Sequence, residues 1–291
     1  MKKALNTKRV VLIDTLAVIT AVFLAIAIKS LLPADVNVED FDSRLVNLIG
    51  FPAVAILYFI IIYVHCIMVM QYFGKKSNLS KQQIGVRFGS VFAAMYLFGM
   101  QEVVVEASPF NEWGLLFMRY QFIIGITDAI PVLLLCLATS YLILNKNNSP
   151  EIIDHLKLGD KIKTVSLITV TFFIQRAIGY ETGLVNSNAA SFPIPTYLWT
   201  ALFGLVLGLS YVVLYPVFSK TNFSLLQPFQ IAVLTIGINW ILFNSFIGLI
   251  FQDVMGQMLF RTGIDIAVLY ATSLCAQLFF YSTDKTNDNR R

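Results

Sequence analysis

Arg176, inside an otherwise apolar segment, is the residue whose position points most directly to chemistry. Apolar segments of about 20 residues cross membranes, and a charge near the bilayer centre costs roughly 3 kcal/mol on insertion scales. Carboxylates on other segments must therefore neutralise it, and the candidates are Asp128, Glu102 and Asp265. Glu181, five residues later, projects from another helix face and is a poor partner. We expect Arg176 to be a conformational anchor first and a ligand contact second.

Glu102 and Glu106 lie one helical turn apart and therefore share a helix face. Two carboxylates at this spacing repel each other, so at least one is protonated or paired with a cation. The pair could form a proton or cation site, or the side chains could lie in the headgroup region of the bilayer. We favour the headgroup position for Glu106 and leave both interpretations open for Glu102.

Asp128 lies near the middle of its apolar segment, three residues before Pro131. Proline removes one backbone hydrogen bond, and the resulting kink can open polar groups to an interior cavity. A buried aspartate at such a kink is a candidate functional residue. The alternative is that Asp128 is the structural counter-ion of Arg176, and the two roles are compatible.

Two asparagines complete the set of candidates. Asn244 shares a helix face with Trp240, and Asn239 is adjacent to that tryptophan. Amides inside a membrane join helices by hydrogen bonds, and we favour this role over ligand contact. The predicted buried polar site consists of Arg176, Asp128, Glu102, Glu106, Asn239, Asn244 and Asp265.

The sequence lacks the residue sets of the common metal and catalytic sites. Its two histidines, His65 and His155, cannot supply the three or four ligands that zinc requires. The three cysteines all lie in apolar stretches and are typical of small buried hydrophobes. No phosphate-binding glycine loop, nucleophile elbow or dinucleotide fingerprint is present. We therefore predict no metal and no cofactor, and the pattern favours a non-enzymatic protein.

The elements that must position these residues are transmembrane helices. Of 291 residues, 57% are hydrophobic and 13% charged, whereas about 25% are charged in a typical soluble domain. The apolar runs are long and continuous, which indicates helices and excludes a barrel of alternating strands. We predict an all-α polytopic bundle, a single integral membrane domain over 1–291. Its eight spans are expected at about 10–32, 46–72, 87–107, 118–144, 164–184, 197–218, 229–252 and 262–281.

Charges in the connections between spans predict the orientation. Lysines gather in the connections on one side and acidic residues on the other, so the positive-inside rule places both termini in the cytoplasm. The basic residues form no single surface, so nucleic acid is not an expected partner. The expected surroundings are a lipid bilayer, and lysine-, asparagine- and isoleucine-rich loops favour the cell membrane of a bacterium.

Three short patterns within about 165–250 resemble a known family. The patterns are Thr171-Phe172-x-x-x-Arg176 followed by Gly179-Tyr180, then Phe203-x-x-x-Leu207, then Trp240-x-x-x-Asn244. They resemble the CPBP family of CAAX proteases and bacteriocin-processing enzymes, whose motifs are Glu-Glu-x-x-x-Arg, Phe-x-x-x-His and His-x-x-x-Asn. The arginine, phenylalanine and asparagine positions match in order, whereas both glutamates and both histidines are replaced.

The replaced positions are the catalytic ones of that family. The resemblance therefore implies a non-catalytic relative that binds a peptide or another membrane protein, with a role in immunity or in the cell envelope. Two other hypotheses remain open from the residues themselves. One is a small secondary transporter or channel that uses the buried carboxylates, and the other is an intramembrane enzyme with those carboxylates as acid or base.

Overall fold

The computed structural model describes residues 7–32, 41–100, 102, 114–146, 156–218 and 226–281, and within these ranges every regular element is helical. The α-helices are α1 (Thr7–Lys29), α2 (Arg44–Ile49), α3 (Phe51–Lys76), α4 (Lys81–Gly99), α6 (Gly114–Ile143), α7 (Leu158–Glu181), α8 (Pro193–Leu214), α9 (Leu226–Pro228), α10 (Ile238–Ile250) and α11 (Met255–Phe280). The 3₁₀ segment η3 (Tyr215–Phe218) extends α8, and the π-helix η4 (Phe229–Gly237) joins α9 to α10. The predicted all-α class is confirmed.

Seven helices of the described residues are long and apolar enough to cross a membrane. They are α1, α3, α6, α7, α8 with η3, the segment from α9 to α10, and α11. The chain is therefore a multi-spanning membrane protein whose outer surface meets lipid. Seven of the eight predicted spans coincide with these helices. The span predicted over 87–107 corresponds to α4, which is not among the seven and is followed mainly by residues outside the described ranges.

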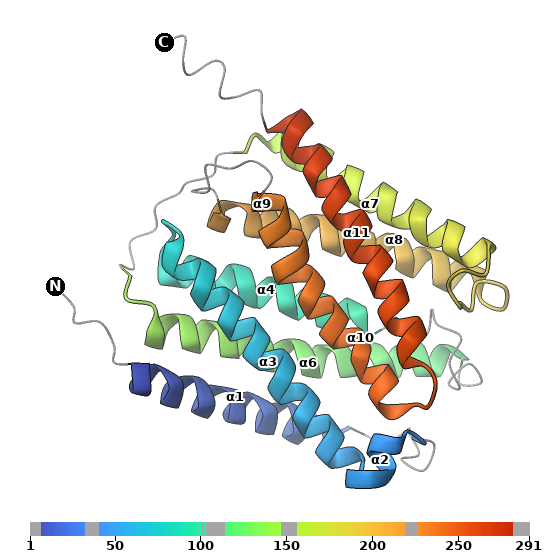
Figure 1. Cartoon of the computed structure of the whole chain (residues 1–291), viewed down its shortest axis with the longest axis horizontal. Helices are drawn as coiled ribbons and strands as arrows, with labels where there is room; N and C mark the ends of the chain where they lie inside the picture. Colours follow the sequence, from blue (N-terminus) through green and yellow to red (C-terminus); the bar gives the residue numbers. More distant parts are fainter. Residues whose placement is uncertain are drawn as a thin grey trace.

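The long helices run back and forth between two ends of the bundle (Figure 1). At one end, α3 and α6 finish and α4 and α7 begin; we call it the lysine-rich end, because it carries Lys75, Lys76, Lys81, Lys157 and Lys163. Lys146 donates to the backbone oxygen of Ser77 there. At the opposite end, the hydroxyl of Ser43 donates to the Leu249 oxygen at 2.6 Å.

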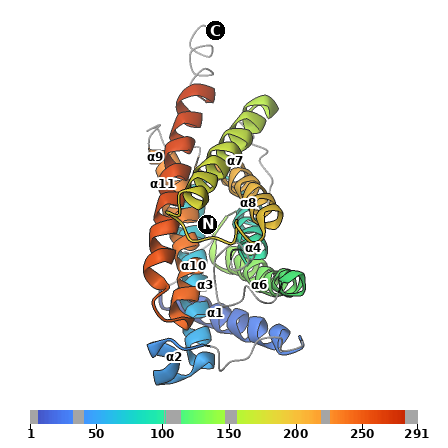
Figure 2. The same ribbon diagram turned by 90° about the vertical axis from the view of Figure 1, so that its right-hand side faces the viewer.

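The helices pack in two groups that share a core. In the first group α4 packs along α6, and α6 also contacts α1; in the second, α8 and α11 both pack against α7. Helix α10 contacts α11 on one side and α3 on the other, and α4 contacts α8, so the groups are joined. The view from the side shows α7 and α8 above α4, α6 and α1, while α11 runs down one side of the molecule (Figure 2).

Glycine allows the closest of these approaches. A Cβ at Gly125 of α6 would lie 2.6 Å from the Leu97 oxygen of α4. At Gly208 of α8, the same atom would lie 2.9 Å from the Val165 oxygen of α7. Small residues let membrane helices approach closely enough for van der Waals contact to hold them together, because hydrophobic burial gives little gain between helices in lipid. These contacts fix the helices that carry the polar residues.

The π-helix η4 changes the register of the helix that carries the two asparagines. The Thr235 hydroxyl donates to the Gln230 oxygen, five residues earlier, at 2.8 Å, and the Ile238 amide donates to the Val233 oxygen. This spacing replaces the four-residue spacing of an α-helix. The segment 229–237 is an uninterrupted apolar run apart from Gln230 and Thr235, so its sequence alone predicts an α-helix there.

Candidate functional site

Two arginines and two carboxylates meet in the interior of the bundle. Arg176 and Arg261 are both fully buried, and Glu102 and Asp265 are nearly so. Asp265 of α11 holds Arg176 of α7 with both oxygens: its Oδ1 lies 2.7 Å from Arg176 Nε and its Oδ2 lies 2.6 Å from Nη2. This two-point geometry is the strong form of the arginine–carboxylate pair.

Glu102, which follows α4 in the chain, joins the two arginines. Its Oε1 lies 3.1 Å from Arg176 Nη2, and its Oε2 lies 3.3 Å from Arg176 Nη1. The same Oε2 is 3.3 Å from Nη2 of Arg261 on α11. We call Arg176, Arg261, Glu102 and Asp265 the charge cluster. Its two positive and two negative charges sum to zero, so each buried charge has a counter-charge in contact.

Side chains of α10 surround the charge cluster on one side. Trp240 donates its indole Nε1–H to Asp265 Oδ2 at 3.1 Å. Arg261 Nη2 donates to Asn244 Oδ1 at 3.2 Å, and Asn244 Nδ2 donates back to the Trp240 backbone oxygen at 2.9 Å. Asn244 therefore fixes the position of an arginine while satisfying its own amide, which is a structural use of a buried polar residue.

Tyr180 and Phe172 complete the surroundings of Arg176 from its own helix. Tyr180, one turn later, accepts a hydrogen bond from Arg176 Nη1 at 3.2 Å, and its hydroxyl lies 3.1 Å from the Thr200 hydroxyl of α8. Phe172, one turn earlier, has its ring centroid 5.3 Å from the guanidinium carbon. Glu181 instead accepts a hydrogen bond from Tyr197, as expected for a residue on another helix face.

The structure brings together four of the seven predicted site residues: Arg176, Glu102, Asp265 and Asn244. The two remaining described residues, Asp128 and Asn239, belong to separate contacts. Glu106 lies outside the described residues, so its predicted headgroup position stays a prediction.

Asp128 is not the counter-ion of Arg176. Its Oδ1 lies 2.7 Å from the ammonium of Lys29 at the end of α1, and that ammonium lies 4.5 Å from the ring centroid of Phe59. The expectation fails because α6 packs between α1 and α4, whereas α7 packs on α8 and α11. Helix packing order, which the sequence does not reveal, decides which carboxylate reaches which cation.

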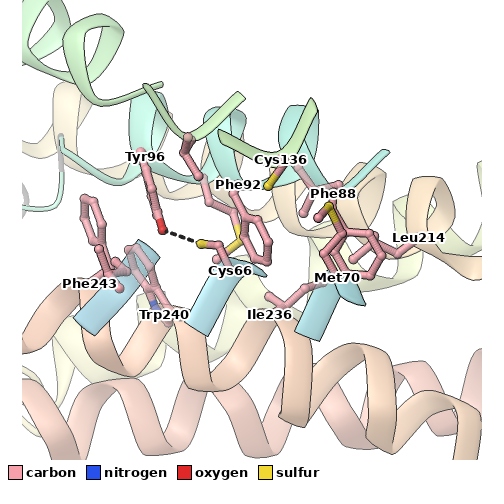
Figure 3. Packing of buried hydrophobic residues seen from close by; sticks show 14 of the residues in the cluster. Cys66, Met70, Phe88, Phe92, Tyr96, Cys136, Leu214, Ile236, Trp240 and Phe243 are labelled. Carbon is pink, nitrogen blue, oxygen red and sulfur yellow. Dashed lines mark hydrogen bonds between the residues drawn. The ribbon is translucent and has the colours of Figure 1, made fainter. Parts of the chain in front are cut away.

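Asn239 forms a second polar group with residues of α3 and α4. Its amide nitrogen lies 3.1 Å from the Tyr96 hydroxyl, 3.3 Å from Cys66 Sγ and 3.4 Å from His65 Nδ1. His65 Nε2 lies 3.2 Å from the oxygen of Leu234 in η4, so it is this nitrogen that carries the proton. Figure 3 shows the bond between Tyr96 and Cys66 among the buried aromatic side chains. Asn239 thus links three helices, in the role predicted for it.

Arg261 was not among the predicted site residues, and Arg176 is therefore not the only arginine buried in the bundle. The span predicted over 262–281 begins one residue after Arg261, whereas α11 begins at Met255. A four-residue spacing between Arg261 and Asp265 puts both on one helix face. If the span had been predicted to begin at Met255, Arg261 and Asp265 would both have been assigned to one helix face inside the membrane.

An apolar layer lies directly against the charge cluster. The Phe203 ring of α8 is 5.8 Å from that of Phe172 and 4.4 Å from that of Trp240, and Leu207 is buried beside them. In the part of the chain that the structure describes, no group of three or more histidine, cysteine, aspartate or glutamate side chains could hold a metal ion. The charge cluster and the apolar layer against it are chemically suited to holding the helices in fixed positions relative to one another.

A scan against protein-family models finds no match for this chain, and comparisons with curated proteins and with solved structures find no match either.

Proposed function

We propose that this multi-spanning membrane protein is a non-catalytic, CPBP-like binding or regulatory protein. The observation that carries the proposal is the meeting of the three motif residues Arg176, Phe203 and Asn244. Arg176 and Asn244 are joined through the charge cluster, because Asn244 contacts Arg261 and both arginines contact Glu102. Phe203 packs on Phe172 beneath Arg176. Residues from three separate helices thus occupy one small region, as a shared motif requires.

The positions that lack the catalytic residues of the family support the non-catalytic part of the proposal. Phe172 stands at an acidic position of the family motif, and Leu207 and Trp240 stand at its two histidine positions. All three are buried, and the rings of Phe172 and Trp240 both pack against Phe203. Hydrolysis needs an acid–base group in contact with the reacting bond. These side chains form an apolar wall instead.

The charge cluster gives the binding function a rigid frame. Its four members tie α7 and α11 to the segment after α4, and Trp240 and Asn244 attach α10. A closed set of counter-charges is costly to open in a membrane, so these helices keep one arrangement. We infer that a peptide or another membrane protein binds to this preformed frame, with the immunity or cell-envelope role that the resemblance implies.

We also propose eight crossings with both termini in the cytoplasm of a bacterial cell. The start of α1 and the end of α11 lie at the same, lysine-rich end of the bundle (Figure 1). An odd number of crossings would place them at opposite ends, so this arrangement supports α4 as an additional crossing. The positive-inside rule then assigns the lysine-rich end to the cytoplasm.

Chemical cross-linking in native membranes tests the binding function. Wild-type protein, extracted in its own lipids by a polymer, should carry a discrete cross-linked peptide or membrane protein identifiable by mass spectrometry. Asp265→Asn leaves the cluster with an unbalanced positive charge and should reduce this adduct several-fold at equal protein amount. Asp253→Asn, at an exposed position, is the matched control and should retain it.

Two results would overturn the proposal. One is hydrolysis of a peptide substrate by the purified wild-type protein. The other is a solute or proton flux in proteoliposomes that disappears in Asp128→Asn, which would establish the transporter in place of the binding protein.

A further inference from the structure

A group of uncharged polar side chains lies between α8 with η3, α9 and α11, on the side of the charge cluster that faces the lysine-rich end. We call it the tyrosine–glutamine cluster; its members are Tyr211, Tyr215, Gln227, Ser273, Gln277 and Tyr281. Polar groups in the membrane interior need partners, because lipid offers none. The arrangement of these six therefore indicates what their polar groups pair with.

The outer level of this cluster is closely connected. Gln227 donates from Nε2 to the Tyr215 backbone oxygen at 3.3 Å, and the Gln227 and Gln277 side chains lie within hydrogen-bonding range of the Tyr215 hydroxyl. The Tyr281 ring centroid is 4.7 Å from that of Tyr215. The Tyr281 hydroxyl lies 2.6 Å from the hydroxyl of Thr164 in α7. Side chains from α7, η3, α9 and α11 thus converge here.

The inner level lies one helical turn deeper. Tyr211 precedes Tyr215 by four residues, and Ser273 precedes Gln277 by four, so each shares a face with its outer neighbour. The Tyr211 and Tyr215 ring centroids are 6.2 Å apart. Both Tyr211 and Ser273 are fully buried. Among the described residues, the Tyr211 hydroxyl, Ser273 Oγ and Gln277 Oε1 have no hydrogen-bond partner.

Buried oxygens of this kind are unfavourable unless something pairs with them. A buried polar group left without a partner costs about 1–3 kcal/mol. An ordered interior water makes about three hydrogen bonds to groups of this kind and removes that cost. Tyrosine, serine and glutamine side chains can each donate and accept, as water does. None of the six members is charged, so no ion is needed to balance the site.

Apolar side chains close the cluster on its inner side. Leu207 precedes Tyr211 by one turn on α8, and Leu269 precedes Ser273 by one turn on α11; both are buried. Beyond them lie Phe172 and Phe203, and then the charge cluster. The tyrosine–glutamine cluster therefore ends before it reaches the buried arginines.

We propose that the tyrosine–glutamine cluster is a hydrated vestibule that takes up water from the lysine-rich end and is closed inward by Leu207 and Leu269. Its tyrosine, serine and glutamine side chains can each donate hydrogen bonds to water and accept hydrogen bonds from it. The vestibule does not depend on the proposed binding function, since it rests on a different set of residues.

Cysteine labelling in lipid nanodiscs tests the vestibule. In a variant with Cys66, Cys136 and Cys275 replaced, Ser273→Cys introduces a thiol of nearly the same size as the serine. Only a thiolate reacts with a water-soluble maleimide, and a thiol in a dry apolar interior ionises poorly, so a hydrated thiol should react at least about tenfold faster. The matched control is the chain whose single remaining thiol is native Cys136, which is equally buried in the apolar core.

The labelling has two decisive outcomes. Fast reaction of Ser273→Cys, with slow reaction of Leu269→Cys and of native Cys136, is expected; full labelling of all three in detergent denaturant shows that the thiols are intact. A Ser273→Cys thiol as slow as Cys136 would overturn the hydration, and a Leu269→Cys thiol as fast as Ser273→Cys would overturn the closed inner boundary.

Tyr211→Phe provides a second measurement that does not depend on labelling. If the Tyr211 hydroxyl is paired with water, its removal should leave the melting temperature unchanged or lower it. If the site is dry, removing an unpaired buried hydroxyl should raise the melting temperature, and that result would overturn the proposal. Tyr72→Phe, at an exposed tyrosine, serves as the control.

Discussion

Asp265→Asn is the substitution that should expose the energetics of the charge cluster most clearly. The change keeps the size of the side chain and an oxygen that can accept from Trp240, but it removes the charge that holds Arg176 through two bonds of 2.7 and 2.6 Å. The cluster then carries two positive charges and one negative charge, and Arg176 keeps its hydrogen bonds to Glu102 and Tyr180.

The expected loss is several kcal/mol. Two unit charges about 4 Å apart attract by about 4 kcal/mol at an effective dielectric constant of about 20. Measured losses on removing one partner of a buried pair are about 3–5 kcal/mol. Since 1 kcal/mol moves the melting temperature by roughly 2–4 °C in domains of 150–250 residues, we expect a fall on the order of 10 °C. Tryptophan fluorescence of the purified protein during heating measures it, with Asp253→Asn as the control.

A double variant separates charge balance from simple loss of contact. Arg176→Gln combined with Asp265→Asn removes one charge of each sign, so that Arg261 and Glu102 still neutralise each other at 3.3 Å. The double variant should therefore be more stable than the sum of the two single losses, with a coupling energy of about 2–3 kcal/mol. Strict additivity of the two losses would refute the reasoning, as would an Asp265→Asn protein as stable as the control.

Two further predictions concern the first helix group. Lys29→Met leaves the buried Asp128 carboxylate without its counter-charge and should lower the melting temperature; Asp128→Leu added to it should restore most of the loss, because replacing a buried pair by apolar groups is often neutral. A double variant no more stable than Lys29→Met would contradict this. Gly125→Ala places a Cβ 2.6 Å from the Leu97 oxygen and should cost about 1–3 kcal/mol, whereas Gly263→Ala, whose Cβ meets nothing within 4 Å, should not be destabilised. Equal stability of the two alanine variants, measured in the same thermal assay, would count against the close approach of α4 and α6.

The helices were the predictable part of the fold, because long apolar runs have few alternatives in a membrane. The partners of Arg176 were predictable as a set of three, and two of the three are correct. The third, Asp128, was wrong because the order in which helices pack is decided by close approaches such as Gly125 on Leu97, which leave no periodic signal. Arg261 was missed because a boundary error of a few residues moved it from the interior to the edge of a span.

The polar partners of Asn239 were harder to predict from the sequence. His65, Cys66 and Tyr96 come from two other helices, and the Leu234 oxygen that holds His65 lies within a π-helix. The composition of an apolar run such as 229–237 is equally compatible with an α-helix and with a π-helix. Its five-residue hydrogen bonding depends on tertiary contacts, so a register counted from the sequence cannot place Asn239 against its neighbours.

The division of the charge cluster among helices has a consequence for how the chain is assembled during synthesis. Arg176 lies in α7, the least hydrophobic of the seven candidate spans. When α7 enters the membrane, Glu102 has already been made, but Asp265 and Arg261 belong to α11, the last helix of the described residues. Until α11 arrives, Arg176 has one carboxylate in place of two, and Glu102 lacks its second arginine. Helix α11 therefore completes the charge cluster, and truncation of the chain before Met255 would leave Arg176 with only one of its two carboxylates.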